Sequence, residues 1–150
     1  MSMEKLHFKI GLAGTYWSKC PIYSILVNDS VKETREITAP SEETFYIEFD
    51  AEVEEGPATL KIRLENKQDS DVVKDDPLSD NFIIVKDLLL HVKSVEIDEI
   101  NLANLIYTGS EFVGDDSSRP VLKNCIDMGW NGTWALEFTS PFYIWLLENI

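Results

Sequence analysis

Several residue types that mark secreted, fibrous or membrane proteins are scarce in this 150-residue sequence. It has two cysteines, Cys20 and Cys125, which lie far apart. In a protein made in the cytosol we expect both to be reduced and buried, with a single long-range disulfide as the open alternative. Seven glycines and six prolines are ordinary numbers, and they exclude collagen-like and low-complexity classes.

Continuous hydrophobic runs are also missing. The first ten residues mix charged and apolar side chains, so they lack the apolar centre of a signal peptide. The longest apolar stretch, residues 142–147, is far shorter than the ~20 residues that a membrane-spanning helix needs. We therefore expect a protein that is made in the cytoplasm and has no membrane partner.

Acidic residues greatly outnumber basic ones. The sequence has 27 acidic residues against 13 basic ones, and its formal net charge is −14. A surface of this sign repels the phosphates of nucleic acids and of anionic membranes, so neither is an expected partner. The same charge favours solubility, binding of cations or docking onto a basic protein.

Motifs that mark common active sites do not occur. There is no nucleophile elbow, phosphate-binding loop, dinucleotide fingerprint or zinc-ligand spacing. The two histidines, His7 and His91, fall on the polar phase of predicted strands, which favours ordinary surface residues over metal ligands. We predict no catalytic residues and no enzymatic activity. A carbohydrate-active enzyme with a chance pair of carboxylates is a further alternative.

Alternation of apolar and polar residues is the strongest pattern in the sequence. Residues 45–53 and 58–64 place apolar side chains at every second position, as half-buried strands do. The turn-forming residues 54–57 between them predict a hairpin. In that hairpin, acidic residues of the first strand would pair with Lys61 and Arg63 of the second.

Further strands are predicted at residues 6–12, 22–27, 88–97 and 134–138. The turn Asn28-Asp29 ends one of them, and a change of phase before Val95 predicts a β-bulge or a new strand. Residues 142–147, apolar on both faces, are interpreted as a strand, with a short helix as the alternative. About eight or nine strands predict an all-β antiparallel sandwich or jelly roll, which forms a single domain over residues 1–150.

Two polar segments, residues 68–81 and 108–120, are predicted as long loops. The first carries five candidate calcium ligands, Asp69, Asp71, Asp75, Asp76 and Asp80, because calcium takes about six to eight oxygen ligands. Three of them have the spacing of EF-hand ligands, but Val73 and Lys74 exclude that loop. Asp115 and Asp116 form a weaker candidate. The alternative for both segments is a solvated acidic loop.

Aromatic residues at predicted turns are candidate sugar-binding groups. Asn131-Gly132 is a typical two-residue hairpin turn, which would leave Trp130 partly exposed, and Trp17 lies at a second turn-like point. Exposed tryptophan rings stack on sugars and anchor protein interfaces, and the alternative for both residues is a place in the core. Trp134 shares the inward phase of its strand and is predicted to be buried.

The C-terminal stretch supplies a candidate interface. Tyr143, Trp145 and Leu147 share one face of the strand predicted there. If no other part of the chain covers that face, it is an assembly surface that would add a strand to the sheet of a neighbouring subunit.

Two segments resemble known carbohydrate-binding modules. Residues 56–67 (GPATLKIRLENK) resemble a strand of the jelly-roll modules. Residues 86–98 (KDLLLHVKSVEID) resemble the strand that leads to their ligand-binding edge, with the calcium-dependent xylan-binding type the most similar. In those modules, carboxylates and main-chain oxygens at one edge hold a calcium ion that contacts the sugar. The resemblance implies a carbohydrate-binding-module-like sandwich with calcium as a candidate cofactor.

A second resemblance covers most of residues 44–150. Residues 86–98 together with residues 129–132 and 141–149 resemble a small β-sandwich protein of T4-like tailed phages, including those of cyanobacteria. This resemblance implies a virion-associated protein with glycan-binding ancestry.

These observations lead to one expected function and one main alternative. We expect a non-enzymatic structural component of a tailed phage virion, associated with the capsid, neck, tail, baseplate or fibres and oligomeric with other virion proteins. The alternative is a glycan-binding module that recognises carbohydrate on the host surface. Trp17 or Trp130 would be its stacking platform, and the aspartates of residues 69–80 would bind calcium.

Overall fold

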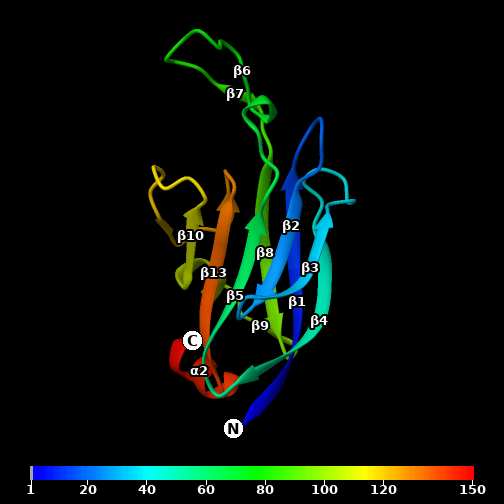
Figure 1. Ribbon diagram of the computed structural model, residues 1–150, viewed down its shortest axis with the longest axis vertical. Helices are drawn as coiled ribbons and strands as arrows, with labels where there is room; N and C mark the ends of the chain where they lie inside the picture. Colours follow the sequence, from blue (N-terminus) through cyan, green and yellow to red (C-terminus); the bar gives the residue numbers. More distant parts are fainter. Residues whose placement is uncertain (1) are drawn as a thin grey trace.

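The chain folds into two antiparallel sheets that lie face to face (Figure 1), and the computed structural model describes residues 2–150. The first sheet has the order β12–β8–β1–β4, with β9 beside β8. Its strands are β1 (Met3–Thr15), β4 (Phe45–Glu54), β8 (Leu89–Ile97), β9 (Ile100–Asn101) and β12 (Asp127–Met128).

The second sheet has the order β11–β10–β13–β5–β2–β3. Its strands are β2 (Ile22–Val27), β3 (Ser30–Glu36), β5 (Gly56–Leu64), β10 (Ser110–Gly114), β11 (Leu122–Lys123) and β13 (Gly132–Ser140). Over residues 2–150, eight strands have five residues or more. The predicted all-β antiparallel sandwich is confirmed.

Inward-pointing apolar side chains of both sheets form one core. Its members include Leu6, Phe8 and Ile10 of β1, Leu60, Ile62 and Leu64 of β5, and Trp134, Leu136 and Phe138 of β13. Burying a side chain of this size stabilises a fold by about 1.5–3 kcal/mol. Trp134 is fully buried, as predicted, and its indole N–H donates to the carbonyl oxygen of Cys125 at 2.7 Å. The alternation in the sequence therefore reflects burial in this core.

Two predicted local features are also present. Asn28 and Asp29 both have positive φ angles, 49° and 66°, and they form the tight turn between β2 and β3. In β8, Ser94 lies opposite Gly11 and Val92 lies opposite Leu12, so the residue between them has no partner on β1. This is the β-bulge that the change of phase predicts.

The hairpin predicted at residues 54–57 is wrong. β4 and β5 are both strands, but β4 pairs with β1 in the first sheet, whereas β5 pairs with β2 and β13 in the second. The turn therefore carries the chain from one layer to the other. Lys61 and Arg63 consequently pair with Asp29 and Asp115 instead of with the acidic residues of β4.

The strand predicted at residues 142–147 is also wrong, because these residues belong to helix α2 (Phe142–Asn149). Phe142 and Leu146 lie one helical turn apart and are both buried against the core. Trp145 packs edge-on against Phe138, with ring centroids 6.3 Å apart. A segment that is apolar at nearly every position has no clear period, so the pattern alone does not distinguish a strand from a short helix.

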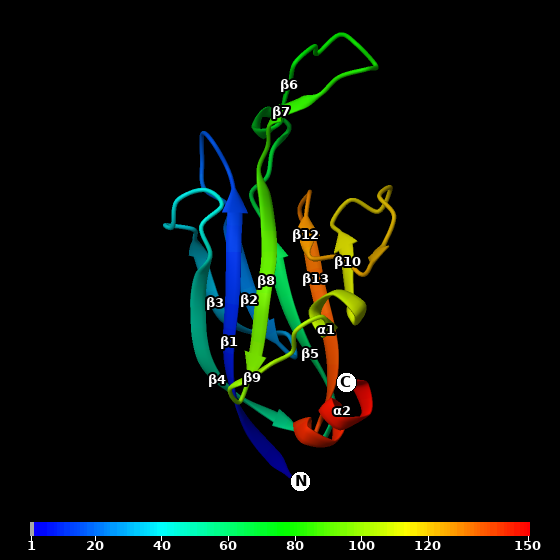
Figure 2. The same cartoon turned by 180° about the vertical axis from the view of Figure 1, so that it is seen from behind.

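The predicted loop at residues 68–81 contains regular structure. It begins with the 3-10 helix η1 (Asp69–Asp71) and continues into β6 (Val73–Lys74), which pairs with β7 (Ile84–Lys86) in a separate hairpin. This β6–β7 hairpin projects beyond one end of the sandwich, and both termini lie at the opposite end (Figures 1 and 2).

The second predicted loop, residues 108–120, includes β10 and follows a one-turn helix, α1 (Leu105–Thr108). Among the residues described, no helix is long and apolar enough to cross a membrane.

Candidate functional site

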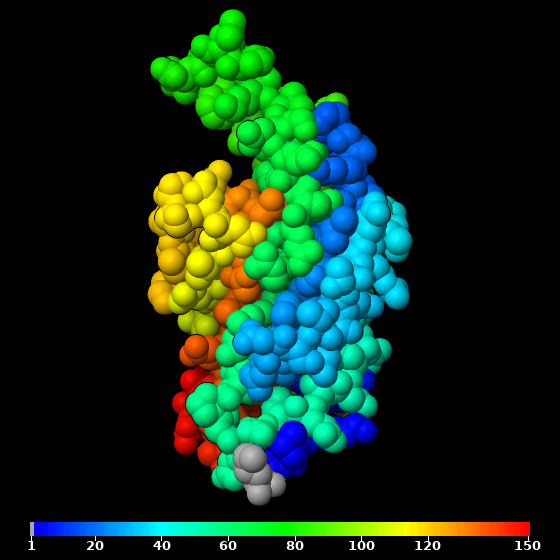
Figure 3. Space-filling model, viewed as in Figure 1, coloured from blue at the N-terminus to red at the C-terminus, as the bar shows by residue number. Residues whose placement is uncertain are grey.

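A cleft of about 720 Å³ opens at the end of the sandwich that carries the β6–β7 hairpin. The hairpin forms one jaw and the β10–β11 segment, residues 115–121, forms the other. The floor consists of residues that follow β5 and residues that precede β13. Figure 3 shows the hollow between the projecting hairpin and the β10–β11 segment. Small-molecule sites commonly have volumes of roughly 300–1,000 Å³, so the cleft has the size of a binding site.

Lys67 holds the floor of the cleft together. Its ammonium group lies 2.6 Å from the Asp87 carboxylate and donates to the carbonyl oxygen of Gly129, also at 2.6 Å. Only 11% of the Lys67 side chain and 19% of the Asp87 side chain are exposed. The ion pair therefore joins the chain after β5 to the chains before β8 and before β13.

Asn131 fixes the same floor through its amide group. Its side chain accepts a hydrogen bond from the backbone N–H of Lys67 at 2.8 Å and donates one to the carbonyl oxygen of Lys67 at 2.9 Å. The predicted two-residue turn at Asn131-Gly132 is thus wrong: Gly132 is the first residue of β13 and pairs with Leu64 and Gly114. A Cβ at Gly132 would lie 2.4 Å from the carbonyl oxygen of Val113, so the close approach of β10 requires glycine.

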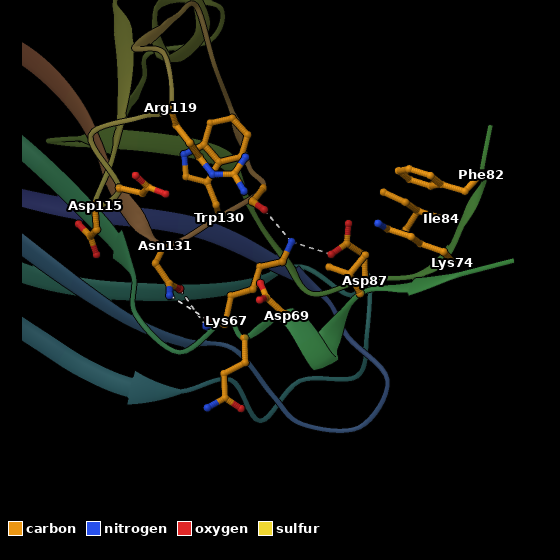
Figure 4. Close-up of a pocket in the computed structure, with 14 residues that line it drawn as sticks. Lys67, Asp69, Lys74, Phe82, Ile84, Asp87, Asp115, Arg119, Trp130 and Asn131 are labelled. Atoms are coloured by element: carbon orange, nitrogen blue, oxygen red, sulfur yellow. Dashed lines mark hydrogen bonds and ion pairs between the residues drawn. The ribbon is translucent and has the colours of Figure 1, made fainter. Parts of the chain in front are cut away.

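Trp130 forms a wall of the cleft beneath the β10–β11 jaw (Figure 4). The guanidinium carbon of Arg119 lies 4.3 Å from the indole centroid, and the Phe112 ring packs against the indole at 5.7 Å. The indole nitrogen faces Gly114 and, among residues 2–150, it is the buried side-chain nitrogen or oxygen that lacks a hydrogen-bond partner. Trp130 is therefore partly buried and covered by Arg119, not an open platform for a sugar ring.

The hairpin jaw presents an apolar surface and a cation. Phe82 and Ile84 are exposed and line the cleft, and the Lys74 ammonium nitrogen lies 4.2 Å from the centroid of the Phe82 ring. Figure 4 shows these three side chains across the cleft from Trp130 and Arg119. The sequence reasoning missed Phe82, although its signal is present: residues 82–85 are an apolar run inside a polar segment.

The five aspartates predicted to bind calcium do not come together. Asp69 lines the cleft, whereas Asp75 and Asp76 accept backbone N–H groups of their own hairpin and Asp80 lies near its tip. Within residues 2–150, no three His, Cys, Asp or Glu side chains form a group suited to a metal ion. These carboxylates therefore do not supply the about six to eight converging oxygens that calcium takes.

Asp71 has a structural role instead. It is buried, and its carboxylate accepts the backbone N–H of Gln68 at 2.7 Å and lies 2.8 Å from the Lys19 ammonium group. Burial by itself raises the pKa of this carboxyl, but the Lys19 ion pair and the Gln68 hydrogen bond outweigh it and hold the pKa below its usual value. Asp71 therefore stays charged and anchors the start of the hairpin.

Asp115 and Asp116 line the opposite jaw. Asp115 lies 3.0 Å from the Arg63 guanidinium group. Asp116 accepts the backbone N–H and the hydroxyl of Ser118, and these bonds lower the pKa of its carboxyl. Both residues lie beside the cleft, and Asp115 is already paired.

Trp17 does not line the cleft. It lines a smaller pocket of about 290 Å³ with Tyr16 and Lys86, and the Lys86 ammonium nitrogen lies 4.8 Å from its ring centroid. Its indole N–H donates to the carbonyl oxygen of Asp71 at 2.8 Å. Trp17 is exposed and Trp130 is not, so the two candidate sugar-stacking residues belong to separate pockets.

The predicted interface residues occupy different faces of α2. Trp145 points toward the core, whereas Tyr143 and Leu147 are exposed and lie beside Ile144 and Ile150. The face predicted from Tyr143, Trp145 and Leu147 therefore does not exist, because residues two apart diverge on a helix. An exposed apolar face made of Tyr143, Ile144, Leu147 and Ile150, hereafter the α2 face, takes its place.

A hydroxyl–imidazole–carboxylate series that the sequence did not reveal joins Thr15, His91 and Asp127. The Thr15 oxygen lies 2.8 Å from His91 Nε2, and His91 Nδ1 lies 2.7 Å from the Asp127 carboxylate. Some active sites use a hydroxyl, an imidazole and a carboxylate in this order to activate the hydroxyl as a nucleophile. Here, however, the Thr15 hydroxyl donates its hydrogen bond to the Glu42 carboxylate. We therefore assign the series the role of tying the loop around Glu42 to β1, β8 and β12.

Comparison with known proteins places the fold. No protein-family model matches the sequence, and no curated protein matches it. One matching solved structure is described as vCBM60 in complex with galactobiose; it has a TM-score of 0.53 and 9% sequence identity, and the match covers 87% of this chain and 96% of that one. The other is the selenomethionine form of vCBM60, with a TM-score of 0.53, 10% identity, and coverage of 87% and 89%.

These matches show a shared fold and no more, since both identities are far below the level at which function transfers. The class of fold is the β-sandwich of carbohydrate-binding modules, as predicted. A particular protein that shares this fold is vCBM60, which is described with a circular permutation that links two families of calcium-dependent carbohydrate binding modules.

Proposed function

We propose that this chain is a non-catalytic carbohydrate-binding module whose ligand binds in the cleft between the β6–β7 hairpin and the β10–β11 segment. The observation that carries the proposal is the cleft itself, which joins exposed apolar side chains to charged groups at the loop end of the sandwich. The fold shared with vCBM60, a protein described in complex with galactobiose, supports it. Carbohydrate of a host cell surface is the partner that we propose.

The cleft offers the two kinds of contact that a sugar needs. A sugar ring has an apolar C–H face, and Phe82 and Ile84 present apolar surface on the hairpin jaw. Sugar hydroxyls both donate and accept hydrogen bonds. The Asp69 and Asp116 carboxylates are acceptors, and Lys74 and Arg119 supply N–H donors. A few polar groups that converge on an apolar patch are typical of small-molecule sites.

We propose that recognition uses these side chains directly and not a calcium ion. Among residues 2–150, the aspartates of residues 69–80 and the carboxylates that line the cleft form no group of three that could hold a metal ion. The description of vCBM60 names calcium-dependent modules, so calcium dependence of this chain should be tested by adding a chelator.

The test is binding of the purified protein to a panel of polysaccharides by affinity electrophoresis, once with calcium and once with chelator. We expect retardation by at least one polysaccharide in both conditions. Phe82→Ala should weaken this binding, because it removes the aromatic surface of the jaw. Absence of binding to every polysaccharide in the panel would contradict the proposal, and loss of binding in chelator would contradict the metal-independent part.

Tyr46→Ala is the matched control for Phe82→Ala. Tyr46 is also an exposed aromatic residue with a lysine above its ring, since Lys9 lies 5.0 Å from its centroid. It lies on β4, outside the cleft, so its removal should leave sugar binding unchanged. An equal loss in both variants would show that the effect is not specific to the cleft.

The α2 face favours a second candidate function, assembly with a neighbouring subunit of a tailed-phage particle. Leu147 is 74% exposed and Ile150 is 81% exposed, and exposed apolar patches of this kind mark interaction surfaces. The α2 face lies at the opposite end from the cleft, so one copy can assemble and bind glycan at once. Mass spectrometry of purified particles should detect the chain, and Leu147→Glu should remove it. Its absence from wild-type particles would refute the assignment.

A further inference from the structure

We infer that the carbohydrate taken by this cleft carries an acidic group, a carboxylate or a sulfate ester, which binds between Lys74 and Arg119. This inference rests on the proposed function and names the ligand class for the same site. The two cations belong to opposite jaws, Lys74 to β6 and Arg119 to the β10–β11 segment, and both line the cleft (Figure 4).

Most basic side chains of this acidic protein already have an acidic partner. Of the 13 lysines and arginines, seven have a carboxylate oxygen within 4.0 Å: Lys5, Lys19, Arg35, Lys61, Arg63, Lys67 and Lys123. In residues 2–150, Lys74 and Arg119 have no such partner, and neither has Lys86 beside Trp17. Three of the six unpaired cations therefore gather at the hairpin end of a molecule with net charge −14.

Aromatic rings hold the two cations of the cleft in place. The Lys74 nitrogen lies 4.2 Å from the centroid of the Phe82 ring, and the Arg119 guanidinium carbon lies 4.3 Å from that of the Trp130 ring. A ring attracts a cation through its quadrupole without neutralising the charge. Each charge is thus positioned on its own jaw and remains available to a ligand.

None of the carboxylates that line the cleft forms an ion pair within 4.0 Å with Lys74 or Arg119 among residues 2–150. Asp87 is paired with Lys67 at 2.6 Å, and Asp115 is paired with Arg63 at 3.0 Å. Asp69 and Asp116 have no basic side chain within 4.0 Å among residues 2–150. They are suited to accept the hydroxyl groups of the same sugar. The lining therefore combines two free cations for an acid with carboxylates for hydroxyls.

The experiment compares polysaccharides that differ only in charge, by isothermal titration calorimetry. The probes are polygalacturonate with its methyl-esterified form, and dextran sulfate with dextran; the first pair tests a carboxylate and the second a sulfate. We expect binding to at least one acidic member and about tenfold weaker or no binding to its neutral counterpart, since charge-assisted bonds are the stronger ones. Work at ~0.15 M salt screens repulsion from charges beyond about 8 Å.

Variants connect this preference to the two residues. Lys74→Gln and Arg119→Gln should each weaken binding to the acidic probe about tenfold. Lys74→Met keeps the aliphatic chain above Phe82 and should show the same loss, because the charge is what is missing. Lys32→Gln is the control, since it removes one charge from β3, away from the cleft. Circular dichroism confirms that each variant is folded.

The outcomes separate this inference from the function on which it rests. Equal binding to acidic and neutral members, or to neutral polysaccharides alone, overturns the acidic-ligand inference and leaves the carbohydrate-binding function in place. Acid-specific binding that Lys74→Gln and Arg119→Gln do not weaken overturns the assignment of these residues. Failure to bind any charged or neutral polysaccharide overturns the proposed function as well.

Discussion

Replacing Lys67 with Met is expected to destabilise the protein by about 2–3 kcal/mol. The substitution removes the ammonium group that contacts Asp87 and Gly129, and it leaves the Asp87 carboxylate with the backbone N–H of Leu88 as its remaining donor at 2.8 Å. Removing one partner of a fully buried ion pair costs about 3–5 kcal/mol. The side chains of Lys67 and Asp87 are 11% and 19% exposed, so water offsets part of that cost.

Lys61→Met is the matched control, because Lys61 is also paired with an aspartate, Asp29. Here the two side chains are 31% and 78% exposed, and exposed pairs contribute up to about 1 kcal/mol. Both substitutions remove the ammonium group of a lysine that is paired with an aspartate, so the difference between them measures the effect of burying the pair.

The assay is urea unfolding followed by tryptophan fluorescence, with the thermal midpoint as a second measurement. For a chain of this length, 2–3 kcal/mol corresponds to a fall of roughly 5–10 °C in Tm. If Lys67→Met is no more destabilising than Lys61→Met, the Lys67–Asp87 pair does not hold the floor of the cleft and the reasoning from its burial is refuted.

Three further predictions concern β13, the His7 cluster and the hairpin. Gly132→Ala should cost about 1–3 kcal/mol in urea unfolding, because its Cβ would meet a backbone carbonyl of β10 at 2.4 Å. A hydrogen bond to Glu48, the larger effect, and one to Asp50 raise the pKa of His7 above 6.5. The contribution of His7 to folding stability is therefore full below pH 6.5 and is lost as the pH rises through the raised pKa. An NMR titration of the His7 ring should show the raised value, and His7→Gln should remove this pH dependence of unfolding. Replacing residues 75–83 with a short Gly-Ser turn should leave the urea midpoint unchanged, because they lie outside the core, and should abolish polysaccharide binding.

The strands were predictable because apolar and polar residues alternate along them as buried and exposed positions alternate. Residues 22–27 coincide with β2, and the alternation at residues 45–53 and 58–64 marks β4 and β5. The phase change before Val95 located a bulge, since one extra residue turns every later side chain to the other face. In these segments the period depends only on the two environments, core and solvent.

Pairing between strands was not predictable in the same way. Alternation says which side chains face inward but does not say which sheet a strand joins, and β4 and β5 face the same core from opposite layers. The short turn at residues 54–57 suits a hairpin and a crossing between layers equally well. The helix α2 was missed for a related reason, because its apolar run has no clear period.

The cleft depended on contacts between distant segments. Asn131 was predicted to form a turn with Gly132, but its amide group binds the backbone of Lys67, a residue 64 positions earlier. Trp130, the residue before it, is partly buried by Phe112 and Arg119, which also come from distant segments. The aspartates of residues 69–80 were predicted to converge, yet a two-stranded hairpin with its own hydrogen bonds separates them.

The floor and the jaws of the cleft are under different physical constraints. Lys67 and Asn131 are tied into the fold by buried bonds, so folding itself restricts which residues can occupy these positions. Lys74, Phe82 and Arg119 are exposed, and little of the core depends on them. Substitutions on the jaws should therefore change the ligand at little cost in stability. The proposed preference for an acidic carbohydrate would therefore depend on the jaws and not on the fold shared with vCBM60.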